Sequence, residues 1–411
     1  MVNLKKYNTK MDIPFFLFFA GMFCLYSITI IQIALICSLG LYVILYFFKK
    51  EMIFDFKKIF LYFLWLGLLT SLAYFSKRYA YGTYPESRTV LTLVKCFLVG
   101  LLIVIYCDSP QKIISLLKAL IFATLVLVFV ACVTSPISSY GKAQEGGFGT
   151  TISQHRNGIG FIAGIACFLS FYLKKIKLLK YGYLLAAILF IGVLITGSRS
   201  GLIQCAITYL LYFVFSRKKN QFKSFIIAII ILVAIFLCIR FIPFLYDTIF
   251  TRLETSFMTI KTGDSYDSST YGRFLYQKLA FQMFQNKPLL GYGTDGFILY
   301  FMDHPTIDGY HFTMFAYSHC NYAELLANYG IVGFVIWYWA ILFSLIVFIK
   351  NRHDNICKML LFLLVGCILL DSTRINWSHN VELYVYILIF NSALIYHKNN
   401  SWKGIKYANF E

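Results

Sequence analysis

The sequence predicts an all-α integral membrane protein with about 12 transmembrane helices. The composition is 59% hydrophobic and only 13% charged, and a soluble chain of 411 residues cannot bury that much apolar surface. Apolar runs long enough to cross a bilayer recur along the chain. The cationic residues gather in short clusters between these runs, as the positive-inside rule requires.

Each predicted span is a run of roughly 20 mainly apolar residues. One helix over residues 13–48 would be about 54 Å long, which is too long for a hydrocarbon core of ~30 Å. We therefore expect a tight turn near Gln32. No cleavage site follows the apolar run that begins at Ile13, so we expect mature structure and not a signal peptide. The spans are 12–28, 31–48, 56–75, 89–107, 114–134, 157–173, 179–196, 200–216, 223–243, 329–349, 356–371 and 380–397.

The distribution of Lys and Arg predicts the topology. With the N terminus in the cytoplasm, the cytoplasmic segments carry 22 of the 37 Lys and Arg residues. Both termini are then cytoplasmic, and residues 1–411 form a single polytopic membrane domain. Residues 244–328 form one large extracytoplasmic loop between the ninth and tenth spans. The helical spacing of apolar residues over 271–285 predicts a short helix in this loop, lying on the membrane surface.

The net charge of +19 does not indicate nucleic-acid binding. The cations follow the loops, and no basic domain could lie along a phosphate backbone, so we expect no nucleic-acid partner. Ten of the eleven cysteines fall inside apolar runs, where they act as small hydrophobic residues. The sequence therefore predicts neither a disulfide framework nor a cysteine metal site.

Polar side chains gather in four segments at the predicted outer helix ends. A guanidinium group beside a helix N-terminus suits phosphate oxygens, and a histidine with an ordinary pKa suits a general base. Each of these residues also has a structural interpretation, such as an interfacial arginine, a cation paired with Asp267, or a hydrogen-bonded histidine. The four segments are 153–158 with Arg156, 196–201 with Arg199, 269–293 with Arg273, and 318–333 with His319, Asn321, Tyr322 and Glu324.

In this order the motifs resemble the bacterial O-antigen ligase and O-antigen or capsule repeat-unit polymerase superfamily. The family pattern has Gly-Ser-Arg-Ser-Gly at the start of a span, then an arginine opening a helix before Pro-Leu-Leu-Gly-x-Gly. A histidine follows, with glycines eleven and fourteen residues after it. The departures are Cys320, where Ser or Asn is usual, and Ala323, where Leu is usual. The matching positions are Arg199, Arg273, Pro288–Gly293, His319, Gly330 and Gly333.

The resemblance implies a GT-C-like membrane glycosyltransferase of the bacterial inner membrane. Its substrate is implied to be a glycan repeat unit linked to undecaprenyl diphosphate, joined to a glycan acceptor with inversion. His319 would deprotonate the acceptor hydroxyl, while Arg273 and Arg199 would stabilise the leaving diphosphate. No metal or other cofactor is expected, because the chain has no DxD motif. A chain-length regulator is a further implied partner, and the expected substrate-binding residues are Arg156, Asn321, Tyr322 and Glu324.

Several alternatives belong to other functional classes. Residues 318–330 resemble repeat-unit polymerases most, which favours a polymerase over a ligase that uses lipid A-core as its acceptor. A flippase or transporter would carry charges at mid-membrane and show paired halves. A peptidoglycan-type polymerase would use an Asp in an outer loop. A non-enzymatic scaffold gives no reason for the ordered motifs.

Overall fold

The computed structural model describes residues 10–25, 28–49, 55–84, 87–140, 147–215, 251–262, 268–313 and 316–398. This part of the chain is mostly helical and confirms an all-α membrane protein. Within it, β structure is confined to a hairpin of β1 (Thr306–Ile307) and β2 (Tyr310–His311). The helices are α1 (Ile13–Cys24), α2 (Thr29–Lys49), α3 (Phe56–Tyr62), α4 (Leu68–Ser76), α5 (Thr89–Tyr106), α6 (Pro110–Thr134), α7 (Arg156–Lys175), α8 (Gly182–Thr196), α9 (Arg199–Phe215), α12 (Thr251–Thr262), α13 (Ser268–Asn286), α14 (Gly296–Asp303), α15 (Asn321–Lys350), α16 (Asn355–Leu370) and α17 (Asn380–Lys398).

Eleven of the predicted spans coincide with described helices. Six of these helices are long and apolar enough to cross a membrane: α2, α3–α4, α5, α6, α7 and α15. A π-helical turn over Phe63–Gly67 joins α3 to α4, so that they form one span. The shorter apolar helices are α1, α8, α9, α16 and α17. The predicted span over 223–243 lies outside the described residues.

The predicted division of residues 13–48 into two helices is confirmed, but Gln32 itself does not lie in the turn. Helix α1 ends at Cys24 and α2 begins at Thr29, so the break lies before Gln32. Gln32 lies in the first turn of α2 and is buried, and its side-chain oxygen accepts a hydrogen bond of 2.6 Å from Lys95 Nζ of α5. A polar residue within an apolar run indicates a turn only when it has no buried partner, and here the partner comes from a distant span.

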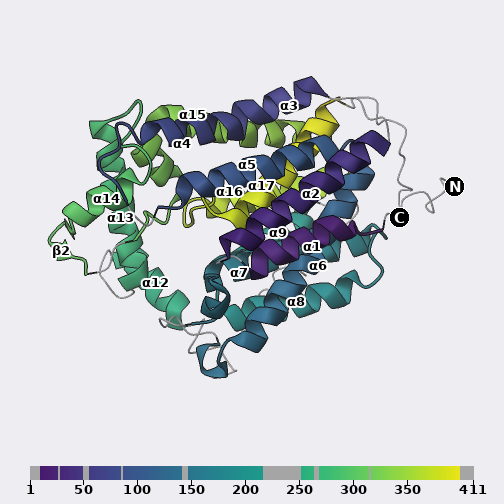
Figure 1. Cartoon of the computed structure of the whole chain (residues 1–411). Helices are drawn as coiled ribbons and strands as arrows, with labels where there is room; N and C mark the ends of the chain where they lie inside the picture. Colours follow the sequence, from purple (N-terminus) through teal and green to yellow (C-terminus); the bar gives the residue numbers. More distant parts are fainter. Residues whose placement is uncertain are drawn as a thin grey trace.

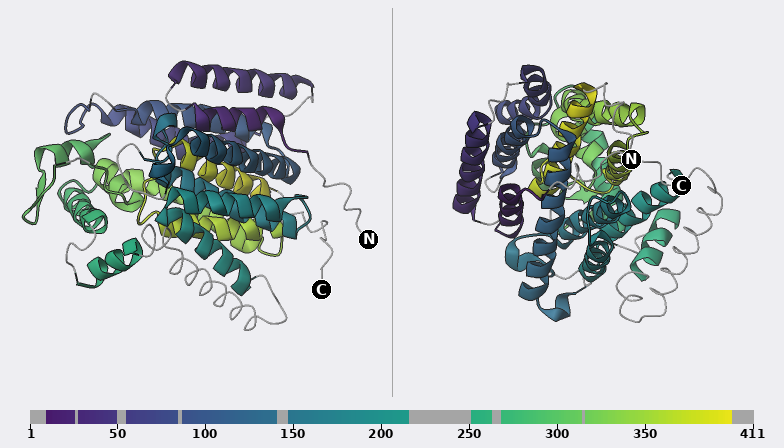
Figure 2. Two further views of the ribbon diagram at one scale, coloured as in Figure 1. Left: turned by 90° about the horizontal axis from the view of Figure 1, so that it is seen from below. Right: turned by 90° about the vertical axis from the view of Figure 1, so that its right-hand side faces the viewer.

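The long helices form a bundle, and α12, α13, α14 and the hairpin gather at one end of it (Figures 1 and 2). Helix α7 packs against α8 and α9, and α1 packs against α6. The predicted helix over 271–285 is confirmed as the greater part of α13. Two further helices, α12 and α14, occupy the same 244–328 segment.

Loops that the topology assigns to one face do lie at one end of the bundle. At the α13 end, Tyr81 N–H donates to Tyr292 O at 2.9 Å, and Gln277 Nε2 donates to Ser372 O at 3.2 Å. At the other end, Lys58 Nζ donates to Val104 O at 2.7 Å. The segments that these contacts join therefore lie at the ends that the prediction assigns to them, while the side of the membrane that each end faces stays a prediction.

Candidate active site

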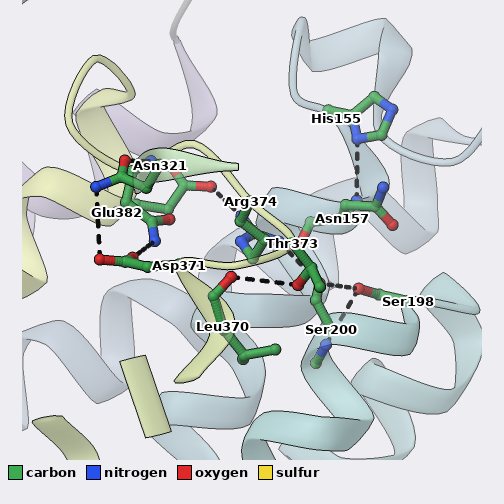
Figure 3. A network of polar contacts seen from close by, with 12 residues as sticks. His155, Asn157, Ser198, Ser200, Asn321, Leu370, Asp371, Thr373, Arg374 and Glu382 are labelled. Carbon is green, nitrogen blue, oxygen red and sulfur yellow. Dashed lines mark hydrogen bonds and ion pairs between the residues drawn. The ribbon is translucent and has the colours of Figure 1, made fainter. Parts of the chain in front are cut away.

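The four polar segments converge at the α13 end of the bundle, together with a fifth, the α16–α17 loop. Figure 3 shows part of this convergence, with residues from the start of α7, the start of α9 and the α16–α17 loop in one network. The network joins segments that lie more than 150 residues apart in the sequence. The site is therefore built by tertiary packing of helix ends.

Helices α7 and α9 touch through their glycines. A Cβ atom added at Gly164 of α7 would lie 2.8 Å from Gly201 O of α9, so a side chain there would push the helices apart. This close approach places the first residues of the two helices, Arg156 and Arg199, at the same end of one helix pair.

Arg199 connects the bundle to the helices beyond it. Its Nη1 donates a hydrogen bond to Ser256 Oγ of α12, and its Nη2 lies 3.5 Å from Ser269 Oγ of α13. Residues four apart on a helix share a face, so Ser269 and Arg273 lie on the same side of α13. The guanidinium group of Arg199 is thus held beside the face of α13 that carries Arg273.

His319 lies in the turn that precedes α15. Its φ of 55° is in the left-handed region, which is uncommon for a residue with a side chain. Burial, and then the positive charge of Arg273, lower the pKa of His319 to about 3, so the imidazole is neutral near pH 7. The ring lies 6.2 Å from that of Tyr276, one turn beyond Arg273 on α13. The side chains of His155, His379 and Arg374 lie near enough to lower this pKa further.

Arg156 is the first residue of α7, directly after His155. The His155 ring keeps an exposed edge, yet desolvation by the surrounding protein, and then the charge of Arg156, lower its pKa to about 4. Its Nδ1 accepts a hydrogen bond of 3.2 Å from the N–H of Asn157 and so caps the helix. Arg156 therefore directly follows a histidine that is neutral at pH 7.

The glycine segment 288–293 completes a break in α15. At Gly330 the backbone leaves the helical conformation (φ 62°, ψ −159°), and the freed carbonyl groups of Ala327 and Asn328 accept the N–H groups of Tyr292 (2.9 Å) and Gly293 (2.7 Å). In return, the N–H groups of Ile331 and Val332 donate to the carbonyl groups of Pro288 (2.8 Å) and Leu289 (3.3 Å). The segment thus replaces the helical hydrogen bonds that the kink removes, and it fixes the half of α15 that follows His319.

Asn321 and Tyr322 anchor the start of α15 to the neighbouring chain. Asn321 Oδ1 accepts the N–H groups of Asn376 (2.8 Å) and Trp377 (3.1 Å), and Tyr322 OH donates to Ile368 O at 2.6 Å. Asn321 is fully buried. The two side chains hold the start of α15, directly after the turn that carries His319, against α16 and the α16–α17 loop, and their predicted role in substrate binding stays a prediction.

Arg374 is a residue of this site that the sequence analysis missed. Its Nη1 donates to Asn157 O and to Ser200 Oγ, both at 2.8 Å, and its Nη2 pairs with Glu382 Oε1 at 2.5 Å. One buried guanidinium thus joins the starts of α7, α9 and α17. Glu382 could have indicated this residue from the sequence. It is an acidic residue near the start of an otherwise apolar span, and such a residue usually pairs with a buried cation.

The glycosyltransferase-like order of motifs is supported by a family comparison. Residues 184–338 match the family model described as O-antigen ligase. The match covers 155 of the 411 residues and supports the resemblance to the O-antigen ligase and polymerase superfamily. No curated protein sequence matches the chain.

The O-antigen ligase match begins within α8 and ends within α15. It includes Arg199, Arg273 and His319, the residues expected to carry the chemistry, together with the glycine segment. Arg156 and the Arg374–Glu382 pair lie outside the match. The O-antigen ligase region therefore supplies most of the cationic site, and its flanking helices complete it.

The sequence predicts that this protein needs no metal ion. Within the described ranges, no three His, Cys, Asp or Glu side chains are grouped as a metal ion would need. Three acidic groups of the site have partners in the protein: Glu324 accepts from Ser318 N–H, Glu382 pairs with Arg374, and Asp371 accepts from Asn376 Nδ2. Metal independence stays a prediction.

Proposed function

We propose that this protein is a membrane glycosyltransferase that polymerises oligosaccharide repeat units linked to undecaprenyl diphosphate. The observation that carries the proposal is the grouping of Arg199 and Arg273 at one face of α13 beside the neutral imidazole of His319. Two guanidinium groups can bind a diphosphate, and an unprotonated imidazole can accept a proton. The match of residues 184–338 to the O-antigen ligase family model supports an enzyme of this type.

In the proposed reaction, the hydroxyl oxygen of one glycan attacks the anomeric carbon of another. The bond from that carbon to the diphosphate oxygen breaks, and the diphosphate leaves with the electron pair. Arg273 and Arg199 stabilise the growing negative charge, and His319 takes the hydroxyl proton. One direct displacement gives inversion at the anomeric carbon, and the second phosphate or the glycan is assigned to Arg156.

The low pKa of His319 fits a base that becomes stronger when the donor binds. Burial and the charge of Arg273 keep the pKa low in the free protein. A bound diphosphate would neutralise that charge and raise the pKa of the imidazole toward its ordinary range. The proton would then be accepted efficiently only when the donor is in place.

Asn321 and Tyr322 would serve substrate binding through the placement of α15, because their polar atoms bond within the protein. The active site would face the extracytoplasmic side of the inner membrane, with both termini cytoplasmic. Reporter fusions after α9 and within residues 263–267 test this arrangement. A cytoplasmic signal from the second fusion would overturn it, because the lipid-linked donor is proposed to be used on the outer face.

A ligase is the second candidate, because the matching family model is described as O-antigen ligase. The chemistry is the same, and only the acceptor differs, being lipid A-core in place of another repeat unit. Purified protein is given the undecaprenyl-diphosphate repeat unit, first alone and then with lipid A-core. A ladder of longer lipid-linked glycans supports the polymerase, and glycosylated lipid A-core supports the ligase.

Deletion of the gene gives the matching test in cells. Loss of a polymerase leaves surface glycan of a single repeat, whereas loss of a ligase leaves long glycan on the lipid carrier. Surface glycan of unchanged amount and length would count against both candidates.

A further inference from the structure

The turn that carries His319 is held by the side chain of Glu324, which follows it in the sequence. Ser318 is fully buried, and its N–H donates a hydrogen bond of 2.8 Å to Glu324 Oε2. Its Oγ donates to Cys320 O at 3.0 Å, across the residue between them. These bonds fix the backbone on both sides of His319, whose left-handed φ needs such support.

Glu324 lies in the first turn of α15 and reaches back to the preceding turn, as acidic residues do in helix caps. Its side chain is 1% exposed, so solvent does not satisfy it. The second oxygen, Oε1, accepts a bond of 3.4 Å from Asn328 Nδ2. The two oxygens therefore each serve one donor of the protein.

Asn328 continues this connection away from the site. Its Oδ1 accepts the N–H of Phe297, in the first turn of α14, at 2.8 Å. Its backbone carbonyl group accepts the N–H of Gly293 at 2.7 Å. A continuous series of hydrogen bonds thus runs from the glycine segment and α14 through Asn328 and Glu324 to the turn at Ser318.

We propose that Glu324 is a positioning residue for His319, and that Asn328 ties that position to the glycine segment. The inference rests on the proposed function, in which His319 is the base. It differs from a role of Glu324 in substrate binding, because both carboxylate oxygens face donors of the protein. Glu324 acts on the reaction only through the geometry of the imidazole.

The substitution Glu324→Gln tests this role. An amide has one oxygen for the two donors, so either Ser318 N–H or Asn328 Nδ2 loses its acceptor. We expect kcat to fall by about 10- to 100-fold, as for small displacements of a catalytic group. The Kd of the undecaprenyl-diphosphate repeat unit should stay within about twofold, because no ligand contact is removed.

A second substitution can restore the series of hydrogen bonds from Ser318 through positions 324 and 328 to Phe297. In the double variant Glu324→Gln with Asn328→Asp, the new amide oxygen accepts Ser318 N–H and its NH₂ group donates to the new carboxylate. The other oxygen of that carboxylate still accepts the N–H of Phe297. Every bond is regained with the charge moved from position 324 to position 328, so kcat should recover to within about threefold of the wild type. The single variant Asn328→Asp places two carboxylates together and should be impaired.

The control is Ser344→Ala, which removes another buried hydrogen bond of α15, from Ser344 Oγ to Ala340 O at 2.7 Å, beyond the kink. It should lower thermal stability without changing kcat. Normal turnover in Glu324→Gln, a loss of donor affinity alone, or a folded double variant without recovery would each overturn the proposal. If the wild type itself makes no product from lipid-linked repeat units, the proposed function fails instead.

Discussion

Arg374 pairs with Glu382 at 2.5 Å, and both side chains are buried. The same guanidinium lies 4.3 Å over the ring of Phe161 and donates to Asn157 O and Ser200 Oγ. The pair therefore stands between three helix N-termini, two of which begin with the arginines assigned to the donor. Because Arg374 bonds to Asn157 and Ser200, the residues next to those arginines, the ion pair helps to position both of them.

Breaking this pair should destabilise the protein strongly. Arg374→Met or Glu382→Met leaves a buried charge without its partner, at a cost of about 3–5 kcal/mol. The double variant Arg374→Met with Glu382→Met removes both charges and should recover much of that loss. Thermal unfolding of the detergent-purified wild type, the two single variants and the double variant measures these differences in stability. A double variant as unstable as the sum of the two singles would show that the ion pair is not what matters.

His319→Ala should abolish most turnover, because the acceptor hydroxyl loses its base. General-base loss typically lowers the rate by 10²- to 10⁴-fold. Donor binding should remain nearly intact, as measured with the purified lipid-linked repeat unit. His311→Ala, in the exposed hairpin, is the matched control and should keep normal activity. A well-folded His319→Ala enzyme with near-normal kcat would remove His319 from the mechanism.

Arg273→Lys keeps the charge but loses the planar fork that fits two phosphate oxygens. We expect weaker donor binding and strongly reduced kcat/KM, and Arg199→Ala should behave in the same way. Lys278→Ala removes another cation of α13, one that pairs with Asp308 at 2.5 Å on the surface, and should have little effect. Loss of activity in both variants that remove a charge, Arg199→Ala and Lys278→Ala, together with near-normal activity in Arg273→Lys, would point to general electrostatics and not to specific phosphate contacts.

The pH dependences of kcat/KM and of kcat should report different pKa values of His319, one for the free enzyme and one for the donor-bound enzyme. In the free protein, burial and the charge of Arg273 lower the pKa of His319 from its ordinary 6.5 to about 3. The acid limb of kcat/KM should therefore lie well below pH 6.5, while that of kcat should lie at higher pH, because the bound diphosphate favours the imidazolium. A kcat/KM limb centred near 6.5 would contradict this environment.

The same shift has a consequence for stability. Below its ordinary pKa of 6.5, the imidazole is protonated in the unfolded chain but stays neutral in the folded one until about pH 3. Folding then becomes less favourable as the pH falls through this window, because the unfolded state binds the extra proton. Rates must therefore be compared where thermal unfolding shows the protein to be fully folded.

Activity should survive EDTA. The proposed mechanism stabilises the diphosphate with guanidinium groups and gives no role to a metal ion. Turnover of the lipid-linked repeat unit is measured before and after chelation, with a Mg²⁺-dependent glycosyltransferase as the positive control. Activity that is lost with EDTA and restored by Mg²⁺ or Mn²⁺ would contradict the arginine mechanism.

The sequence by itself determined the class of fold, because the length and apolarity of a run decide whether a helix can cross a bilayer. It also determined the order of Arg199, Arg273 and His319 along the chain, which the family match supports. Local patterns also predicted the helix over 271–285, which is the greater part of α13. These features depend on residues close together in the sequence.

Only the tertiary structure decided which of these groups meet. The hydrogen bond from Lys95 explains why Gln32 lies in a helix and not in a turn. Asn328 accepts the N–H of Phe297 from α14. Arg374 donates to the carbonyl group of Asn157, which lies more than 200 residues away in the sequence. Periodicity carries no information about such pairs, since each is fixed by how the helices pack. The position of the turn that carries His319 depends on such pairs, because a buried donor or acceptor without a partner is costly and the partners here lie on other helices.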